Sequence, residues 1–314
     1  MPTSFLPPRL RYSLGYEAAE HVLGVVGYGA GRPADLAADI PFIQTPLAPL
    51  AGGTAYEIWQ APGPVRACAA GPVAGAYGGG LAFGAVRLAP GAMEETVEQA
   101  YDALFHFLAE AGCPVPLRFW NYLDDILGDE AGMERYRRFN IGRHRAFTRH
   151  LRQAVPPAAS GVGGVGESVI YVLGGQAPAV AVENPRQMSA YAYPPQYGPR
   201  SPGFSRAGRL GGALFISGTA SIVGHETRHA DNATAQAAET AENLRTLISA
   251  AGLEHTLGRG EGWAVKTYMR EGGADVLTPV LAQVFGAGAQ RLDLRGDVCR
   301  SDLALEVEAF YQGG

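Results

Sequence analysis

Alternating hydrophobic and polar residues mark the last segment of the chain, from Gln290 to Phe310. Successive side chains of a strand point to opposite faces, so this alternation, broken only at 300–302, predicts a β-hairpin. One predicted face is aliphatic. The other carries a thiol, a carboxylate and guanidinium groups, from Arg291, Arg295, Cys299 and Glu306. Either a solvated face with weak ion pairs or a functional site is consistent with this pattern.

Helical periodicity occurs twice, in segments with the same surroundings. Apolar residues recur at spacings of three and four over 93–112 and again over 234–252, and both segments end in Ala-Gly. Each predicted helix follows a Gly-containing strand pair and precedes a strand and a second helix, over 132–151 and 274–288. We therefore predict an α+β chain with a repeated unit, in which mixed sheets are packed by helices on one face.

The order of these segments predicts three domains. Residues 1–75 contain short strand-like stretches between Pro/Gly-rich loops, and no stretch there has helical length. The two repeats predict a central domain over 76–185 and a C-terminal domain over 186–314. We interpret the β-rich N-terminal domain as a degenerate third copy.

Composition narrows the class of protein. The 314 residues are 47% hydrophobic and 18% charged, as in a compact globular chain, and the net charge of -5 gives no footprint for nucleic acid or an anionic membrane. Neither a signal peptide nor an apolar stretch of membrane-spanning length is evident. The three cysteines, Cys68, Cys113 and Cys299, form no CxxC pair. We expect a cytoplasmic protein with reduced thiols.

Two segments are rich in groups that bind anions. The predicted helix over 132–151 and the residue after it hold seven arginines from Arg135 to Arg152, and a solvated basic face explains them equally well. Asn140 and Arg143 are candidate site residues there. Residues 183–209 are too rich in Pro, Tyr and Gly for regular structure. Aromatic and guanidinium groups in such a loop favour an ordered site for a planar anion.

Two metal- or nucleotide-like motifs have the wrong context. His225 to His229 match HExxH, but the match falls in a turn before the helix that Asp231 or Asn232 is expected to cap, so zinc binding is a minor alternative to a polar turn. The GVGGVG stretch at 161–166 precedes a strand rather than a helix, which removes the helix dipole that would hold a phosphate.

The C-terminal half resembles the YjgF-type reactive-intermediate deaminases, through FISG, AENLRTLISAAGL, WAVKTYM and LALEVEAF. The resemblance places that family's last-strand glutamate at Glu306 and its carboxylate-binding arginine at Arg291. The whole chain is more specifically similar to the chorismatases. The matching segments are RFWNYL, YRRFNIGRHRAF, PAASGVG, SAYAYPPQYGPRSPGFSRA, FISGTASIVGHET and DVCRSDLALEVEAF.

The chorismatase resemblance implies a pseudo-threefold arrangement of YjgF-like domains in one monomeric chain, with the active cleft between the central and C-terminal domains. It implies cleavage of the enolpyruvyl ether of chorismate, without metal or cofactor. Glu306 would protonate the methylene carbon, which requires a pKa raised by an apolar site. Because the substrate is a dicarboxylate, Arg143 and Arg200 are candidate binding residues, with Tyr197 as a hydrogen-bond donor.

The chorismatase resemblance also implies which product is formed. Family members divide at two positions facing the ring, which match Gly212 and Cys299, and this pair resembles the branch that forms pyruvate and 3-hydroxybenzoate. One alternative is the hydrolytic branch, which forms 3,4-dihydroxycyclohexa-1,5-diene carboxylate. Another is a YjgF-type imine deaminase or metabolite-binding protein. A packing role would also explain Cys299.

Overall fold

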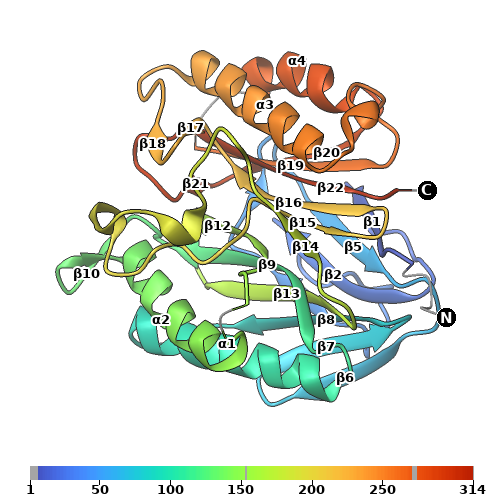
Figure 1. Ribbon diagram of the computed structural model, residues 1–314. Coiled ribbons are helices and arrows are strands. Elements are labelled where there is room, and N and C mark those ends of the chain that lie inside the picture. The colour runs from blue at the N-terminus through green and yellow to red at the C-terminus, as the bar shows by residue number, and fades with distance from the viewer. Residues whose placement is uncertain (1–5, 153, 271–273, 314) are drawn as a thin grey trace.

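Three main β-sheets share one interior, and helices cover two of them on the outside (Figure 1). The computed structural model describes residues 6–152, 154–270 and 274–313. The predicted α+β class, with mixed sheets packed by helices on one face in a pseudo-threefold arrangement, is confirmed.

The N-terminal sheet has four strands in the order β1-β5-β2-β3. Its strands are β1 (Arg9–Ser13), β2 (Val22–Tyr28), β3 (Phe42–Gln44) and β5 (Ala55–Gln60). No helix is assigned in its described residues, in agreement with the β-rich prediction.

The central sheet has seven strands in the order β21-β12-β9-β13-β8-β7-β6. Six of them come from one stretch of chain: β6 (Arg66–Ala70), β7 (Val73–Gly78), β8 (Leu81–Arg87), β9 (Val115–Asp124), β12 (Ala158–Gly164) and β13 (Val169–Gly175). Helices α1 (Met93–Glu110) and α2 (Arg135–His150) pack on the outer face, and a small ribbon, β10 (Asp129–Glu130) with β11 (Met133–Glu134), precedes α2. Both helices were predicted.

The C-terminal sheet also has seven strands, in the order β14-β15-β16-β22-β19-β20-β4. They are β4 (Ala48–Pro49), β14 (Val180–Val182), β15 (Ala207–Leu210), β16 (Ala213–Thr219), β19 (Trp263–Met269), β20 (Gln290–Arg295) and β22 (Leu305–Tyr311). Helices α3 (Ala233–Ala250) and α4 (Ala274–Phe285) cover it, and the Asn232 side chain caps α3 as one of the two predicted residues. A ribbon of β17 (Ile222–Val223) and β18 (Glu226–Thr227) lies beside it.

The predicted C-terminal hairpin is wrong. Strand β19 lies between β20 and β22, pairing parallel with β20 and antiparallel with β22. The chain leaves β19, crosses through α4 and returns in β20, and such a crossover makes the two strands parallel. Both segments form strands as predicted, but β22 is buried on both faces, and alternation does not identify the partner of a strand.

The sheet to which each strand belongs indicates where one domain ends and the next begins. Residue 75 lies inside β7, and both β6 and β7 belong to the central sheet, while β14 belongs to the C-terminal sheet. We therefore propose breaks between β5 and β6 and between β13 and β14. Two short strands cross these limits, because β4 pairs with β20 and β21 (Asp297–Val298) pairs with β12.

Candidate active site

A cavity of about 310 Å³ lies at the seam between the central and C-terminal domains. Its walls come from the start of α2, the long Tyr/Arg loop, the end of β16, the segment after β21, and β22. The lining residues used below are Tyr136, Tyr193, Tyr197, Phe204, Arg206, Gly218, Cys299, Arg300 and Glu306. The seam is held by direct bonds, since the Ser217 hydroxyl of β16 accepts from the Ala159 amide of β12 and donates to the Ser205 carbonyl.

Glu306 supplies the buried carboxyl of this cavity. Its side chain is only 5% exposed, and its Oε1 atom has no hydrogen-bond partner within the described residues. Burial, and secondly the negative charge of Glu308, raise the Glu306 pKa to about 8, although Arg118 and Arg206 oppose the shift. A carboxyl with this pKa is mostly protonated at neutral pH, so Glu306 can act as an acid.

Glu308, two residues further along β22, belongs to a buried ionic network in the shared interior. Its carboxylate lies 2.9 Å from Arg118 Nη2 and 3.0 Å from Lys266 Nζ, and it accepts hydrogen bonds from Trp120 and Ser160. Burial alone would raise its pKa, but Lys266 and Arg118 lower it to about 2. A permanently charged carboxylate is thereby fixed beside Glu306.

The network connects all three sheets. Lys266 of β19 lies 2.5 Å from Glu57 Oε2 of the N-terminal sheet as well as near Glu308, and donates to three tyrosine hydroxyls, those of Tyr28, Tyr122 and Tyr171. Every partner is almost completely buried. Buried ions keep their charge only when they are paired in this way.

Gly218 gives the Glu306 carboxyl its space. A Cβ atom built at residue 218 would lie 2.0 Å from Glu306 Oε1, closer than any van der Waals contact. Only glycine therefore allows the observed position of the acid. Gly218 was part of the FISG segment that signalled the fold, although it was not predicted as a site residue.

Cys299 lies in the same cavity because the strand before it, β21, pairs with the central sheet and not with the C-terminal sheet. Strand β21 leaves the C-terminal domain to pair with β12, with Val298 opposite Val162, and this places the following residue at the seam. Burial, followed by the charge of Glu306, raises the pKa of the Cys299 thiol to about 12. The thiol is therefore neutral and acts by its size and polarity rather than as a thiolate nucleophile.

Two arginines line the cavity without a carboxylate partner. Arg206 is 2% exposed, donates to the Tyr193 hydroxyl and the Met188 carbonyl, and keeps a buried Nε without a hydrogen bond. Arg300 donates to the His225 carbonyl and lies 4.2 Å from the Tyr197 ring centroid. Neither forms an ion pair within the described part of the chain. Such guanidiniums are suited to bind the carboxylates of a ligand.

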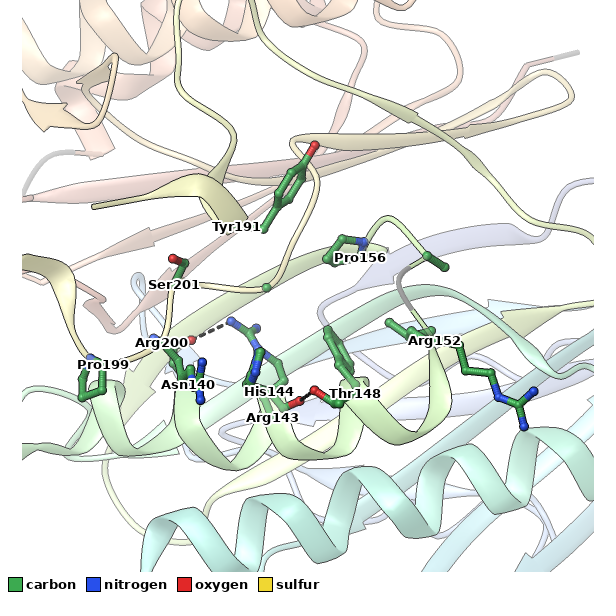
Figure 2. Close-up of a pocket in the computed structure, with 14 residues that line it drawn as sticks. Asn140, Arg143, His144, Thr148, Arg152, Pro156, Tyr191, Pro199, Arg200 and Ser201 are labelled. Atoms are coloured by element: carbon green, nitrogen blue, oxygen red, sulfur yellow. Dashed lines mark hydrogen bonds between the residues drawn. The ribbon is translucent and has the colours of Figure 1, made fainter. Parts of the chain in front are cut away.

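Four of the other predicted residues lie in three different places. Tyr197 lines the Glu306 cavity, where its hydroxyl lies 2.7 Å from the His225 carbonyl oxygen. Arg143 and Arg200 line a separate, larger cavity on the other side of the loop, shown in Figure 2. Gly212 lies in the turn between β15 and β16, next to Gly313, and does not line the Glu306 cavity.

Arg291 lies on the opposite face of the C-terminal sheet from Glu306. It pairs with Val265, which packs under the helices, and its guanidinium binds Asp293 and Thr278 of α4. Glu306 pairs with Tyr268, which belongs to the shared interior. The predicted common face of Arg291 and Glu306 is therefore wrong, and its cause is the incorrect hairpin, which gave the two strands one common register.

The HExxH segment forms a hairpin and not a helix. Glu226 and Thr227 constitute β18, and His229 has a left-handed φ of 58°. Within residues 6–152, 154–270 and 274–313, no three His, Cys, Asp or Glu side chains are grouped so that they could hold a metal ion. The segment contributes instead to the wall behind Tyr197, through the bond to His225.

Comparison with known proteins agrees with this geometry. Residues 57–174 match the family described as Chorismatase FkbO/Hyg5-like, N-terminal. A protein of Streptomyces hygroscopicus named 3-hydroxybenzoate synthase is 38% identical over 74% of this chain and 74% of its own length. A chorismatase of Streptomyces rapamycinicus is 34% identical over 92% of each chain.

A crystal structure of a chorismatase superposes with a TM-score of 0.88, at 29% identity, over 98% of this chain and 99% of the other. None of the described helices is long and apolar enough to cross a membrane. The extent and identity of these matches show that the chain belongs to the chorismatase family.

Proposed function

We propose that this protein cleaves the enolpyruvyl ether of chorismate and releases pyruvate and 3-hydroxybenzoate. The observation that carries the proposal is the composition of one cavity, in which the buried, protonated Glu306 lies with two guanidiniums that have no carboxylate partner. An acid and two anion-binding groups are what a dicarboxylate enol ether requires. The relative named 3-hydroxybenzoate synthase supports the product.

Glu306 starts the reaction in this scheme. Its proton moves to the methylene carbon, which becomes the methyl group of pyruvate, and the ring–oxygen bond breaks with its electron pair remaining on oxygen as the pyruvate carbonyl. The neighbouring ring hydroxyl oxygen then bonds to the carbon that lost pyruvate and its original carbon–oxygen bond breaks, so the hydroxyl has moved by one carbon and the positive charge lies on the carbon that it left. Loss of one ring proton to the Glu306 carboxylate gives the aromatic ring and restores the acid.

Arg206 and Arg300 are our proposed partners for the two substrate carboxylates. Both line the Glu306 cavity, and Tyr193 and Tyr197 stack beside them at 5.6 and 4.2 Å from guanidinium carbon to ring centroid. Tyr197 remains a proposed hydrogen-bond donor. The roles first expected for Arg143 and Arg200 have less support, since the loop separates their cavity from Glu306.

Water balance distinguishes the two chorismatase products. Pyruvate and 3-hydroxybenzoate together contain the same atoms as chorismate, whereas the diene diol route consumes one water. A cavity that excludes water around Glu306 therefore favours 3-hydroxybenzoate. Gly218 packs directly against Glu306 Oε1, so no water fits between these two groups.

The test is incubation of purified protein with chorismate, with and without a chelator, followed by assay of pyruvate and chromatography of ring products. We expect equimolar pyruvate and 3-hydroxybenzoate, unchanged by the chelator. Diene diol as the product would move the chain to the hydrolytic branch. Turnover of an imino acid without action on chorismate would support the deaminase alternative. A monomeric, cytoplasmic enzyme stays a prediction, which light scattering tests for the oligomeric state.

A further inference from the structure

A second cavity, of about 660 Å³, lies between helix α2 and the loop that runs from Tyr191 to Gly203. Figure 2 shows Asn140, Arg143 and His144 rising from α2 toward loop residues 199–201. The proposed reaction uses none of these groups. The cavity is roughly twice the volume of the one that contains Glu306.

The lining of this cavity is cationic. It includes Arg143, Arg152, Arg200 and His144, and no described lining residue is an aspartate or glutamate. Arg152 and Arg200 form no ion pair or hydrogen bond within the described chain. Burial lowers the pKa of the His144 imidazole, and the nearby positive charge of Arg200 lowers it further. An excess of positive charge in a concave surface attracts anions.

Arg143 is the most informative of these residues. Its side chain is 2% exposed, yet its guanidinium has no carboxylate partner within the described residues. It donates to Asn140 Oδ1 at 2.7 Å, interacts with the Tyr101 hydroxyl and lies 4.6 Å from the Phe139 ring centroid, so all of these partners are neutral. The other α2 arginines are more exposed and all have carboxylate partners: Arg135 with Glu130, Arg137 with Glu134, Arg138 with Glu94, Arg145 with Glu94 and Glu98, Arg149 with Glu98 and Asp102. A buried guanidinium without a counterion is costly, and a bound anion would remove that cost.

The remaining walls of the cavity are apolar and can pack against an aromatic ring. Phe147, Leu151, Pro156 and Tyr191 line the cavity with apolar surface, and the Arg143 guanidinium lies 6.0 Å from the Phe147 ring centroid. The Asn140 Nδ2 atom is buried without a hydrogen bond and offers one more donor. A ligand with one carboxylate and one flat apolar ring satisfies both halves of this surface.

We propose that this cavity is a second ligand site, which binds a small aromatic carboxylate through Arg143 and Arg200. Its ring packs on Phe147 and Leu151. The assignment depends on this cavity alone and not on the reaction. 3-Hydroxybenzoate itself belongs to this chemical class.

The geometry also couples the two cavities. Ser201 and Gly203 line the second cavity, whereas Pro202 and Phe204 line the Glu306 cavity, so alternate residues of one extended segment face opposite sides. A ligand held by Arg200 therefore fixes the wall of the active cavity. This coupling rests on the proposed function. It predicts that an aromatic carboxylate inhibits turnover by a route other than competition with chorismate.

The binding test is calorimetric titration of the whole protein with benzoate. We expect two molecules per chain for wild type, and at least tenfold weaker binding of one of them in Arg143→Lys and in Arg200→Ala. Arg200 is exposed, so its variant tests the site even if Arg143→Lys folds poorly. Arg145→Ala, on the same helix but outside the cavity, is the matched control and should bind as wild type. One benzoate per chain, or two in every variant, overturns the second site.

Further arms test the ligand class and the coupling. Pyruvate and sulfate should bind the second site at least tenfold more weakly than benzoate, and equal binding of sulfate overturns the aromatic class. Benzoate should inhibit pyruvate release with a noncompetitive component that Arg200→Ala removes and Arg145→Ala keeps. Purely competitive inhibition of wild type overturns the coupling. Because titration requires no turnover, an inactive protein with two benzoate sites would reject the proposed function alone.

Discussion

Glu306 and Glu308 lie on the same face of β22, two residues apart, and the protein moves their carboxyl pKa values in opposite directions, to about 8 and about 2. Burial is common to both. Glu308 alone has the cations Lys266 and Arg118 within 3.0 Å, while Glu306 faces a cavity. One strand thus supplies an acid that keeps its proton and an anion that helps to keep it there.

The first prediction concerns Glu306. Glu306→Gln keeps the shape of the side chain but cannot donate a proton to carbon, so pyruvate release should fall by about 10²–10⁴-fold or more. Chorismate binding should be nearly unchanged in a fluorescence or calorimetric titration. In wild type the protonated form of Glu306 is the active one. We therefore expect kcat/KM to be retained below pH 8 and to fall as the pH rises through about 8. A Gln variant with normal turnover would remove Glu306 from the mechanism.

The second prediction concerns Glu308. Glu308→Gln removes the negative charge that raises the Glu306 pKa, so the falling limb of kcat/KM should move to lower pH. The variant should also lose about 3 kcal/mol or more of stability, since Lys266 and Arg118 lose a buried partner. Because the Glu308 pKa is lowered, this stability is present above its unfolded value of 4.5 and is lost as the pH falls toward 2.

Glu57→Gln is the matched control for that experiment. It also removes a carboxylate from Lys266, but Glu57 does not contribute to the Glu306 shift. We expect a similar loss in denaturant unfolding with little movement of the pH limb. If both variants move the limb, general destabilisation and not the charge of Glu308 is the cause. If neither variant moves it, the charge of Glu308 does not raise the Glu306 pKa.

The third prediction separates two glycines. Gly218→Ala places a methyl group on Glu306 Oε1 and should reduce turnover by about 10²-fold by displacing the acid. At Gly212 the nearest atom to an added Cβ is 3.4 Å away and φ is not left-handed, so Gly212→Ala should retain activity and stability. Steady-state kinetics and thermal unfolding of the pair decide this. Equal effects of the two changes would contradict the assignment of Gly218 to the site.

The fourth prediction concerns carboxylate binding. Arg206→Lys and Arg300→Lys should each raise the KM for chorismate, because an ammonium keeps the charge but cannot form two parallel hydrogen bonds. Arg291→Ala, on the far face of the sheet, should leave the KM unchanged. A higher KM for Arg291→Ala together with a normal KM for both Lys variants would restore the original sequence-based assignment.

Local sequence patterns were sufficient for the helices and most strands. Amphipathic spacing identified α1 and α3, and the polar residues before the second periodic segment limited its cap to Asp231 or Asn232, of which Asn232 is the cap. Pairing of strands distant in sequence was beyond such patterns. The alternation in β20 and β22 has the same form whether the two strands are neighbours or have β19 between them.

The site was predictable where a residue's own strand determines its direction. Glu306 of β22 is such a residue. Tyr197 lines the same cavity from the long loop, and the position of Cys299 depends on β21 joining a different sheet. Arg206 and Arg300 were hidden among many arginines, because only their missing partners distinguish them. Sequence could not separate them from Arg143 of α2 and Arg200 of the loop, which line another cavity.

The last prediction concerns product choice. Cys299 fills space beside Glu306, and its thiol is neutral, with a pKa raised to about 12, so its contribution is volume rather than nucleophilic attack. Cys299→Ala removes one sulfur atom and leaves room for water near the acid. Pyruvate release should continue, while the product shifts from 3-hydroxybenzoate toward the diene diol, which requires that water. Adding Gly212→Ala should change nothing more, because Gly212 lies outside the cavity. Chromatography of both variants decides the matter: unchanged 3-hydroxybenzoate from Cys299→Ala would show that the thiol's volume does not control water access.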